Sequence, residues 1–240
     1  MQKIEFQPMA KGLESFLPAP IPSRNTIPNW YKNAPLYVNN EKDFGMHPNP
    51  VASVSNSTLK GCVPFLDALT TGYMAVLSSD VEFKKVNGEI TVRWLQPIIK
   101  IVEGHNIDQT FMLPTEHKEE KYASKWLFDW HIKTPPGYSC LYTHPLNRHD
   151  LPFRTFTGVV DTDTFPDSVH FPFQILNFEG ERTIVPAGTP ICQIFPFKRD
   201  SWESDILEFE EGKKQKAVFK ILSFINRSYK RQFWHKKSYN

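Results

Sequence analysis

The chain has 240 residues, of which 40% are hydrophobic and 14% aromatic, and its formal net charge is +2. This length supports one large all-β domain or two small ones with a substantial buried core, and the composition excludes a disordered chain. The small net charge excludes a strong overall attraction to nucleic acid or to an anionic membrane, and no apolar run approaches the roughly 20 residues of a spanning helix.

The numbers of proline, glycine and cysteine residues also limit the possible folds and the possible cellular compartments. Twenty prolines against eleven glycines favour many short strands that are separated by rigid turns. Cys62, Cys140 and Cys192 lie far apart and are odd in number, which fits reduced thiols better than a disulfide framework. The first residues include acidic and polar side chains where a secretion signal needs a continuous apolar stretch. We therefore expect a cytoplasmic protein.

Residues 1–57 are predicted to form an extended, proline-rich arm. The run FLPAPIPSRNTIP holds prolines too often for a helix, and each proline biases the preceding residue toward extended backbone. Within the arm, IPNWYKNAP predicts a short helical turn in which Trp30 and Tyr31 follow Pro28. These two rings either pin the arm to the domain by burial or stack on a ligand.

Residues 58–200 are predicted to form the β-rich core. A short helix before Thr70 comes first, because the apolar residues of GCVPFLDALT repeat at helical spacing. Apolar and polar residues then alternate on both sides of Asn87-Gly88, a strong signal for a β-hairpin. A charged loop or helix is expected at residues 116–125, and the pattern after it is again strand, turn and strand.

Residues 201–240 are predicted to form a helical tail that packs on the core. Phe219, Leu222 and Ile225 share one helical face, with basic residues beside them. The final run SYKRQFWHKKSYN interleaves bases with aromatic residues, a pattern that is able to stack on single-stranded nucleic acid. Packed aromatics and solvent-facing lysines are the alternative for this run, and we favour it.

Three phrases follow one another between Pro135 and Arg199, namely PPGYSCLY, TGVVDTDTF and IVPAGTPICQIFPFKR. Each joins a Pro/Gly chain reversal to an apolar run that is typical of a strand. Charged residues gather among these phrases more densely than connecting loops require, so we expect a site here. Its candidate residues are Asn147, Arg148, Arg154, Asp161, Asp163, Gln193, Lys198 and Arg199.

At GVVD and PAGTPICQ the chain resembles the β-clip superfamily of dUTP pyrophosphatases and dCTP deaminases. TTGYMAVLSSDVEF is also similar to the Ala-Gly-Tyr-Asp-Leu segment of that family, so the resemblance covers residues 70–197. It implies a mainly β fold with a β-clip or related β-sandwich or barrel core, to which the extended N-terminal arm and the C-terminal helix predicted above are added. It also implies that Asp161 occupies the position of the water-activating aspartate, and Gln193 that of a contact residue.

Several departures from the family pattern argue against inherited catalysis. THPLNR stands where the family has an Arg-Ser-Ser or Arg-Ser-Gly phosphate loop, so the small residues that approach a triphosphate closely are missing. Met74 replaces the aspartate of the Gly-Tyr-Asp phrase, and Gln174 aligns with the catalytic glutamate of a deaminase. A glutamine cannot transfer the proton. No glycine follows Gly212, although a pyrophosphatase closes a glycine-rich arm over its substrate.

The aspartates and the bases each allow two interpretations. If Asp161 is a general base, with Asp163 near it, its carboxylate orients a water against an α-phosphorus while Mg²⁺ neutralises the phosphates. Alternatively, DTDT is a plain turn, because Asp and Thr side chains hydrogen-bond nearby backbone amides. The bases among the candidates either converge on an anion or form salt bridges. His144 and Asp150 are only weak metal candidates, because no histidine pair has a metal-binding spacing.

The sequence as a whole, including the segments IPNWYK and PFKRDSW, also resembles a family of uncharacterised proteins from tailed phages and bacteria. We therefore expect a non-catalytic binding or structural module of phage or bacterial origin, without a cofactor, in the host cytoplasm or a virion. Its expected partner is a second copy of the chain or a phage or host protein. A nucleotide is the alternative ligand, whereas nucleic acid and membranes are not expected. The alternative function is a divergent dUTP or dNTP hydrolase with Asp161 as base and Mg²⁺, and a metal-dependent oxygenase ranks last.

Overall fold

A computed structural model describes most of the chain, namely residues 2–36, 58–87, 89–95, 99–105, 107–109, 123–176, 179–210, 229–230 and 233–240. The chain divides into two compact units. The first, here called the β unit, comprises Met1–Thr26 and Gly72–Arg199, and the second, here called the helical unit, comprises Ile27–Thr71 and Asp200–Asn240. The division into arm, core and tail stays a prediction.

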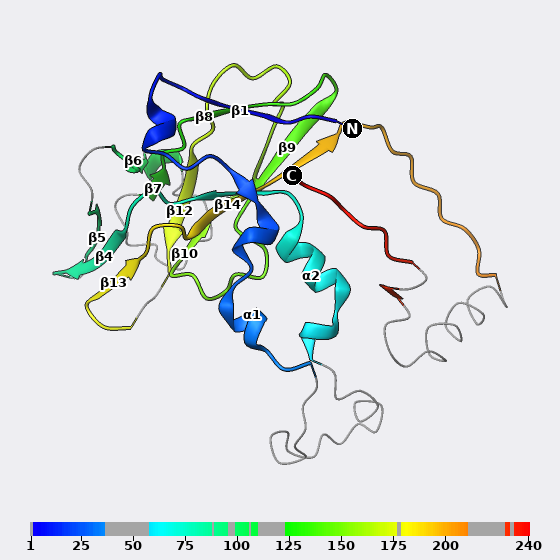
Figure 1. The fold of residues 1–240 in the computed structure, drawn as a ribbon, viewed down its shortest axis with the longest axis horizontal. Helices are drawn as coiled ribbons and strands as arrows, with labels where there is room; N and C mark the ends of the chain where they lie inside the picture. Colours follow the sequence, from blue (N-terminus) through cyan, green and yellow to red (C-terminus); the bar gives the residue numbers. More distant parts are fainter. Residues whose placement is uncertain are drawn as a thin grey trace, which may run out of the picture. The chain divides into compact units, whose positions relative to one another are not determined.

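The β unit is built from short antiparallel strands, as the proline content predicted (Figure 1). The strands are β1 (Glu5–Pro8), β2 (Ile21–Pro22), β3 (Tyr73–Val76), β4 (Val81–Val86), β5 (Glu89–Trp94), β6 (Val102–His105), β7 (Ala123–Trp126), β8 (Trp130–Lys133), β9 (Tyr138–Thr143), β10 (Phe153–Thr155), β11 (Gly158–Val160), β12 (Phe171–Ile175), β13 (Arg182–Val185) and β14 (Pro190–Lys198). The predicted mainly β fold is confirmed.

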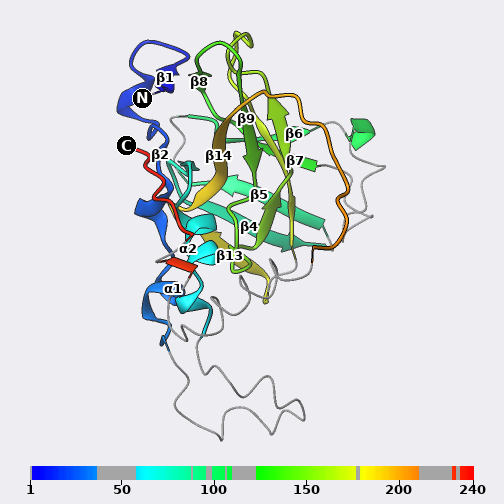
Figure 2. The same ribbon diagram turned by 90° about the vertical axis from the view of Figure 1, so that its right-hand side faces the viewer.

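The described strands form four sheets. The largest has the order β11-β9-β14-β3-β2, and a four-stranded sheet has the order β10-β12-β7-β6. A three-stranded sheet, β13-β4-β5, and the pair β1-β8 complete the unit. Figure 2 shows β9 and β14 side by side, and their antiparallel pairing extends from Gln193 opposite Thr143 to Lys198 opposite Tyr138. This strand pair fixes the positions of the candidate site residues.

An aromatic cluster occupies the core between the smaller sheets. Phe83 of β4 meets Trp126, Phe153 and Phe173 of β7, β10 and β12, and all four side chains are fully buried. The rings of Trp126 and Phe173 stack with centroids 3.9 Å apart, while Phe153 meets Trp126 edge-on at 5.1 Å. Large buried rings contribute strongly to stability through area and ring geometry, so this cluster holds the two sheets together.

The turns that the sequence predicted are present. Gly137 follows the Pro135-Pro136 pair with φ +82°, and Gly188 in the Pro186-Ala187-Gly188 turn has φ +81°, a backbone region that favours glycine. The predicted hairpin is formed by β4 and β5, which pair from Val86 opposite Glu89 to Val81 opposite Trp94. Gly88 of that turn lies outside the described residues.

The helical unit contains the two predicted short helices, α1 (Asn29–Asn33) and α2 (Val63–Thr70). Pro64 stands in the first turn of α2, where a missing backbone N–H costs nothing, and Leu69 of that helix is buried. Tyr31 of α1 is buried and stacks on Phe65 with ring centroids 5.8 Å apart, as anchoring predicts. Its neighbour Trp30 stays 43% exposed.

Other predicted features fall outside the described residues. They include most of the charged stretch at 116–125, of which residues 123–125 belong to β7, and the helical face of Phe219, Leu222 and Ile225. Residues 201–210, which were expected to join a helix, form neither helix nor strand. The three cysteines are free thiols. Within the described residues no helix has the length and apolarity that crossing a membrane requires.

Candidate functional site

The candidate residues at one end of the β9–β14 pair form an ion cluster, which comprises Gly137, Ser139, Asp161, Asp163 and Arg199. The Arg199 guanidinium binds both Asp163 oxygens, with its Nη1 2.8 Å from Oδ1. Its Nη1 also donates to Ser139 Oγ at 3.0 Å and lies 3.2 Å from Asp161 Oδ1. The backbone N–H of Gly137 donates to Asp163 Oδ2 at 2.8 Å, and Ser139 Oγ donates to Asp161 Oδ1 at 2.6 Å. The three phrases therefore meet here.

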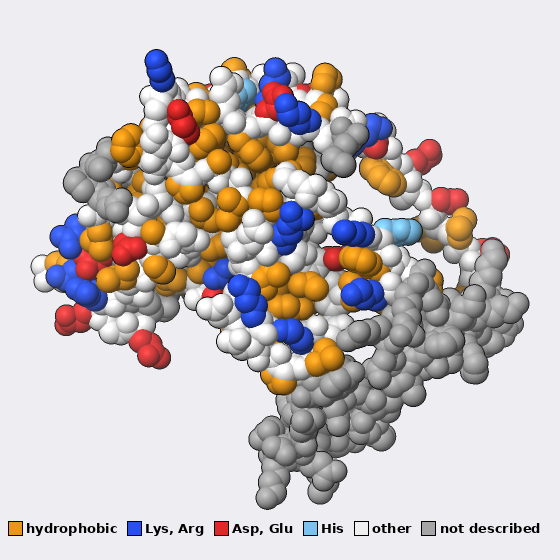
Figure 3. Space-filling model, in the orientation of Figure 1, with side chains coloured by type: hydrophobic (Ala, Val, Ile, Leu, Met, Phe, Trp, Pro, Cys, Tyr) orange, Lys and Arg blue, Asp and Glu red, His pale blue; other side chains and the backbone are white. Residues whose placement is uncertain are grey.

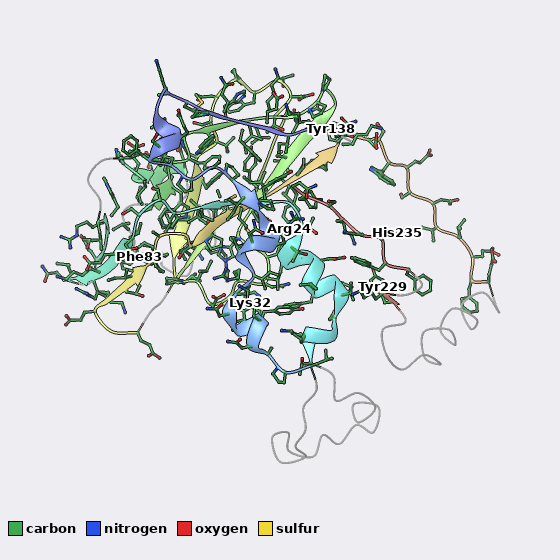
Figure 4. All side chains as sticks on the ribbon, viewed as in Figure 1. Arg24, Lys32, Phe83, Tyr138, Tyr229 and His235 are labelled. Carbon is green, nitrogen blue, oxygen red and sulfur yellow. The ribbon has the colours of Figure 1, made fainter. Side chains whose placement is uncertain are left out.

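Strand geometry explains why these phrases converge. Lys198 lies opposite Tyr138, so the next residue of the chain, Arg199, reaches the PPG turn that precedes β9. Its backbone N–H donates to the Gly137 carbonyl, and its Nη1 donates to the Tyr138 carbonyl at 3.1 Å. Tyr138 is labelled in Figure 4 at this end of the sheet. On the other side of β9, β11 pairs with it, and Val160 lies opposite Cys140. Asp161 is the next residue after Val160, so it follows directly at the end of β11.

Electrostatics in the ion cluster favours a fixed ion pair. Hydrogen bonds from Arg199, and then from the Gly137 N–H, lower the pKa of Asp163 from its ordinary value of 3.8 to about 2. The hydrogen bonds that Arg199 donates to Asp163 raise the pKa of the guanidinium in turn. The Asp163 side chain is only 6% exposed, whereas that of Asp161 is 62% exposed. A bidentate Arg–carboxylate pair of this kind is directional and holds its two loops in register.

Asp161 also begins a turn through its own backbone. Its carbonyl accepts hydrogen bonds from the backbone N–H groups of Thr164 and Phe165, at 3.1 and 2.9 Å. Between the two aspartates, Thr162 is buried and its hydroxyl lies 2.8 Å from that of Thr134 and 3.4 Å from Cys140 Sγ. The DTDT sequence thus has the geometry of the plain turn that was one of its two interpretations.

The ion cluster does not fit a bound Mg²⁺. Magnesium takes carboxylate and phosphate oxygens in near-ideal octahedral geometry and keeps several waters. Both oxygens of Asp163 accept hydrogen bonds from Arg199, and one also accepts from Gly137. The guanidinium charge lies against both carboxylates, where it opposes a divalent cation. No group of three His, Cys, Asp or Glu residues in the described part of the chain could hold a metal ion.

At the other end of the strand pair, Asn147 and Arg148 lie in the loop that follows β9, and Gln193 contacts this loop from β14. Gln193 is fully buried, and its Oε1 accepts a hydrogen bond from the backbone N–H of Leu146 at 2.9 Å. Arg148 is 9% exposed and binds Asp150 with both Nε and Nη2, at 2.8 and 3.0 Å. Asn147 adopts a positive φ of +59°. These contacts bind the loop to itself and to β14, and we call residues 143–150 the buried loop because residues 143, 145 and 148 are buried.

His144 fixes the buried loop with both of its ring nitrogens. Nδ1 accepts from the backbone N–H of Thr155 at 3.3 Å, which leaves Nε2 to carry the proton and donate to the Arg148 carbonyl at 3.1 Å. Burial lowers the pKa of His144, and the Arg154 and Arg148 charges act in the same direction. With neither nitrogen available, the neutral ring is poorly placed to ligate a metal.

The eight candidates therefore do not form one site. Gln193 lies opposite Thr143 and Lys198 opposite Tyr138, so five residue steps separate the buried loop from the ion cluster. At about 3.4 Å per residue this separation is about 17 Å. Arg154 of β10 is exposed and pairs in register with Gln174 of β12, and the Lys198 side chain is also exposed. An anion bound by all four bases would have to bridge these positions.

Sequence reasoning missed two members of these networks. Ser139 joins Asp161 to Arg199, and Thr155 donates its N–H to His144 and its hydroxyl to the Ile191 carbonyl at 2.6 Å. Ser139 lies inside the PPGYSCLY phrase, two residues after Gly137, so that phrase carried a usable signal. For Thr155 the sequence offered none, because its partners are 11 and 36 residues away.

Solved structures that resemble this chain include two phage dUTPases. One is a mutant dUTPase of Staphylococcus bacteriophage 80alpha, solved with dUpNHpp; it is 10% identical, the TM-score is 0.34, and the match covers 88% of this chain and 90% of that one. The other is a mutant dUTPase from phage phi11 of S. aureus, with 9% identity, a TM-score of 0.33, and coverage of 88% and 99%. Neither a protein-family model nor a curated protein matches this chain.

Both structures belong to the class of protein that the GVVD and PAGTPICQ phrases predicted. Both TM-scores lie below 0.5, so what this chain does has to be inferred from its own residues.

Proposed function

We propose that this chain is a non-catalytic binding or structural module on a mainly β fold. The ion cluster is the observation that carries this proposal. Asp163 and Arg199 are bound to each other through two hydrogen bonds, and Ser139 and Arg199 both contact one oxygen of Asp161. A base that activates water has to direct an available oxygen at that water, whereas these groups bind the turns of the same chain.

The buried loop supports the same proposal. A triphosphate site needs small residues and backbone amides that face the ligand, yet Leu146 N–H is bound to Gln193 and Arg148 is paired with Asp150. Thr155 N–H and the Arg148 carbonyl occupy both nitrogens of His144. The polar groups of this loop are therefore used to support the end of the sheet.

A protein is the partner that we propose for such a module, either a second copy of this chain or another phage or host protein. The formal net charge of +2 gives no overall attraction for nucleic acid or for an anionic membrane. The large exposed apolar residues of the helical unit, among them Trp202 and Ile206, support a protein partner. A place in the host cytoplasm or in a virion belongs to the same proposal.

The test is a nucleotide screen on the purified chain. We expect no deoxynucleoside triphosphate to raise the thermal unfolding temperature in the presence of Mg²⁺, and no pyrophosphate or phosphate release above the buffer rate. Asp161→Asn should behave as the wild type in both measurements. Release that is present in the wild type and absent in Asp161→Asn would contradict the proposal.

One observation favours a second candidate, a divergent nucleotide hydrolase. The Asp161 side chain is 62% exposed and receives the Ser139 hydroxyl hydrogen bond, so a carboxylate oriented by two neighbours does face solvent. In that case Arg199→Gln should abolish nucleotide binding as well as turnover, because the guanidinium would contact a phosphate. If Arg199→Gln lowers stability without changing nucleotide binding or turnover, the guanidinium has a structural role in holding the turns and no role with a nucleotide.

A further inference from the structure

The segment directly after Arg199 has an unusual composition. Asp200–Glu210 reads DSWESDILEFE, which has five acidic residues and no basic one, together with four large apolar residues. The backbone of residues 201–210 forms neither helix nor strand. We call this stretch the acidic segment. Its charge sign is opposite to the net charge of the whole chain.

The apolar residues of the acidic segment are almost fully exposed. Trp202 is 91% exposed and Ile206 97%, while Leu207 and Phe209 are 78% and 75% exposed. The other large apolar side chains that are exposed in the described residues reach at most 61%. Figure 3 shows acidic and apolar side chains following one another along this stretch. Because large apolar groups drive association when they leave water, such a stretch is typical of a docking element.

The helical unit also presents a surface of the opposite charge. It is called the basic surface here and combines partly exposed apolar side chains with lysines, namely Trp30, Lys32, Leu59, Lys60, Tyr229, Lys230, Phe233, Lys236 and Lys237. The apolar members are 43% to 61% exposed. Figure 3 shows Lys and Arg side chains beside apolar ones over α1 and α2.

Contacts inside the helical unit hold the basic surface together. Trp234 Nε1 donates to Asp67 of α2 at 2.9 and 3.1 Å, and Lys237 forms an ion pair with the same carboxylate. Lys60 Nζ donates to the carbonyls of Tyr31 and Lys32 at the end of α1, both at 2.6 Å. The described part of the C-terminal tail is thus bound to α2, while the lysines that face solvent keep the surface positive.

We propose that the acidic segment of one copy docks on the basic surface of a second copy of this chain. Charge complementarity selects this occupant, because the segment carries five acids and the surface several lysines around exposed aromatic rings. Trp202 and Ile206 are the anchors, since buried aromatic and aliphatic anchors dominate interface energies. No side chain in the described part of the chain covers them, as exposures above 90% show. The proposal names the partner of the module proposed above and rests on that proposed function.

Light scattering coupled to size-exclusion chromatography tests this docking. The wild type should elute as an assembly of at least two 27.9 kDa chains, and Trp202→Ser/Ile206→Ser should shift it toward the monomer. The matched control is Phe16→Ser/Leu95→Ser, which removes two exposed apolar side chains from the β unit and should keep the assembly. A monomeric wild type at about 100 μM, or an assembly that the first variant leaves intact, overturns the proposal.

A charge exchange then identifies the two surfaces. Glu203→Lys/Glu208→Lys and Lys32→Glu/Lys236→Glu should each weaken self-association at least about tenfold, because like charges then face each other across the interface. The combination of all four substitutions should restore association by reversing both partners. If it does not, the acidic segment binds a different surface, and the proposal is wrong. Neither measurement uses a nucleotide, so nucleotide turnover would contradict the proposed function without affecting this result.

Discussion

The two ends of the β9–β14 pair contain similar residue types and use them differently. At one end, Asp163 and Arg199 form an ion pair at the surface, with the guanidinium side chain 38% exposed. At the other end, Gln193 is fully buried and His144 is neutral, with both ring nitrogens bonded to backbone groups. The first end holds turns together through an ion pair at the surface, whereas the second combines the Arg148–Asp150 ion pair with hydrogen bonds between uncharged groups around the buried Gln193.

This difference shows why charge density in a sequence is a weak sign of catalysis. The residues that look most reactive, Asp161 and Asp163, lie where three turns must be held close together. Strained or chain-reversing loops need donors and acceptors for their own backbone groups, and charged side chains supply the strongest ones. A structural role for these residues therefore produces the same composition as an active site.

The buried end should be the more sensitive to mutation. Gln193→Ala removes the acceptor of the Leu146 N–H and leaves a cavity beside β3 and β9, so the free energy of unfolding should fall by about 2–4 kcal/mol. Guanidinium unfolding followed by tryptophan fluorescence measures this loss. Gln174→Ala on the partly exposed face of β12 is the matched control and should cost less than about 1 kcal/mol. Equal losses of stability in Gln193→Ala and Gln174→Ala would mean that the buried Gln193 side chain stabilises the fold no more than a partly exposed glutamine does.

Local signals in the sequence were sufficient for much of the fold. Pro/Gly turns, alternating apolar residues around Asn87 and the helical spacing in GCVPFLDALT predicted elements that depend on neighbours along the chain. The turns before β9 and β14 were located by the same reasoning, because Gly137 and Gly188 both need positive φ. Such features are encoded within a few residues.

The division of the site was not predictable in this way. Whether Arg148 and Arg199 meet depends on the register of β9 against β14, which is a contact between strands about 50 residues apart. The direction of the pairing places residues 143–150 at one end and Arg199 at the other, and no local pattern reports this. The exposure of residues 201–210 was also not predictable, since the sequence after Asp200 favours a helix, whereas these ten residues form neither helix nor strand.

Acid should weaken the His144 end first. Burial lowers the pKa of His144 below its ordinary value of 6.5, so the unfolded chain binds this proton more readily than the folded one. Stability is therefore unaffected by this group above pH 6.5 and falls as the pH drops below that value. Protonation of Nδ1 would also remove the acceptor for Thr155 N–H.

Urea unfolding at pH 7.5 and at pH 5.5 measures this dependence. In His144→Gln the loss of stability between the two values should be smaller than in the wild type. His235→Gln, an exposed histidine of the helical unit, should retain the full loss. An unchanged loss in His144→Gln would show that other groups cause the acid sensitivity.

The ion cluster should give the smallest effect and respond in a lower pH window. The pKa of Asp163 is about 2 in the folded chain against an ordinary value of 3.8, so its contribution is complete above pH 3.8 and is lost as the pH falls toward 2. Asp163→Asn should thus lower the unfolding temperature at pH 6 by less than Gln193→Ala does, because solvent and salt screen a partly exposed guanidinium. The difference between this variant and the wild type should shrink between pH 4 and 2.

Glu103→Gln, which removes a carboxylate that pairs with Lys100 and Lys125 elsewhere, should leave the Asp163→Asn difference unchanged at pH 6. A difference that stays constant down to pH 2 would mean that hydrogen-bond geometry, rather than the charge of Asp163, holds these turns.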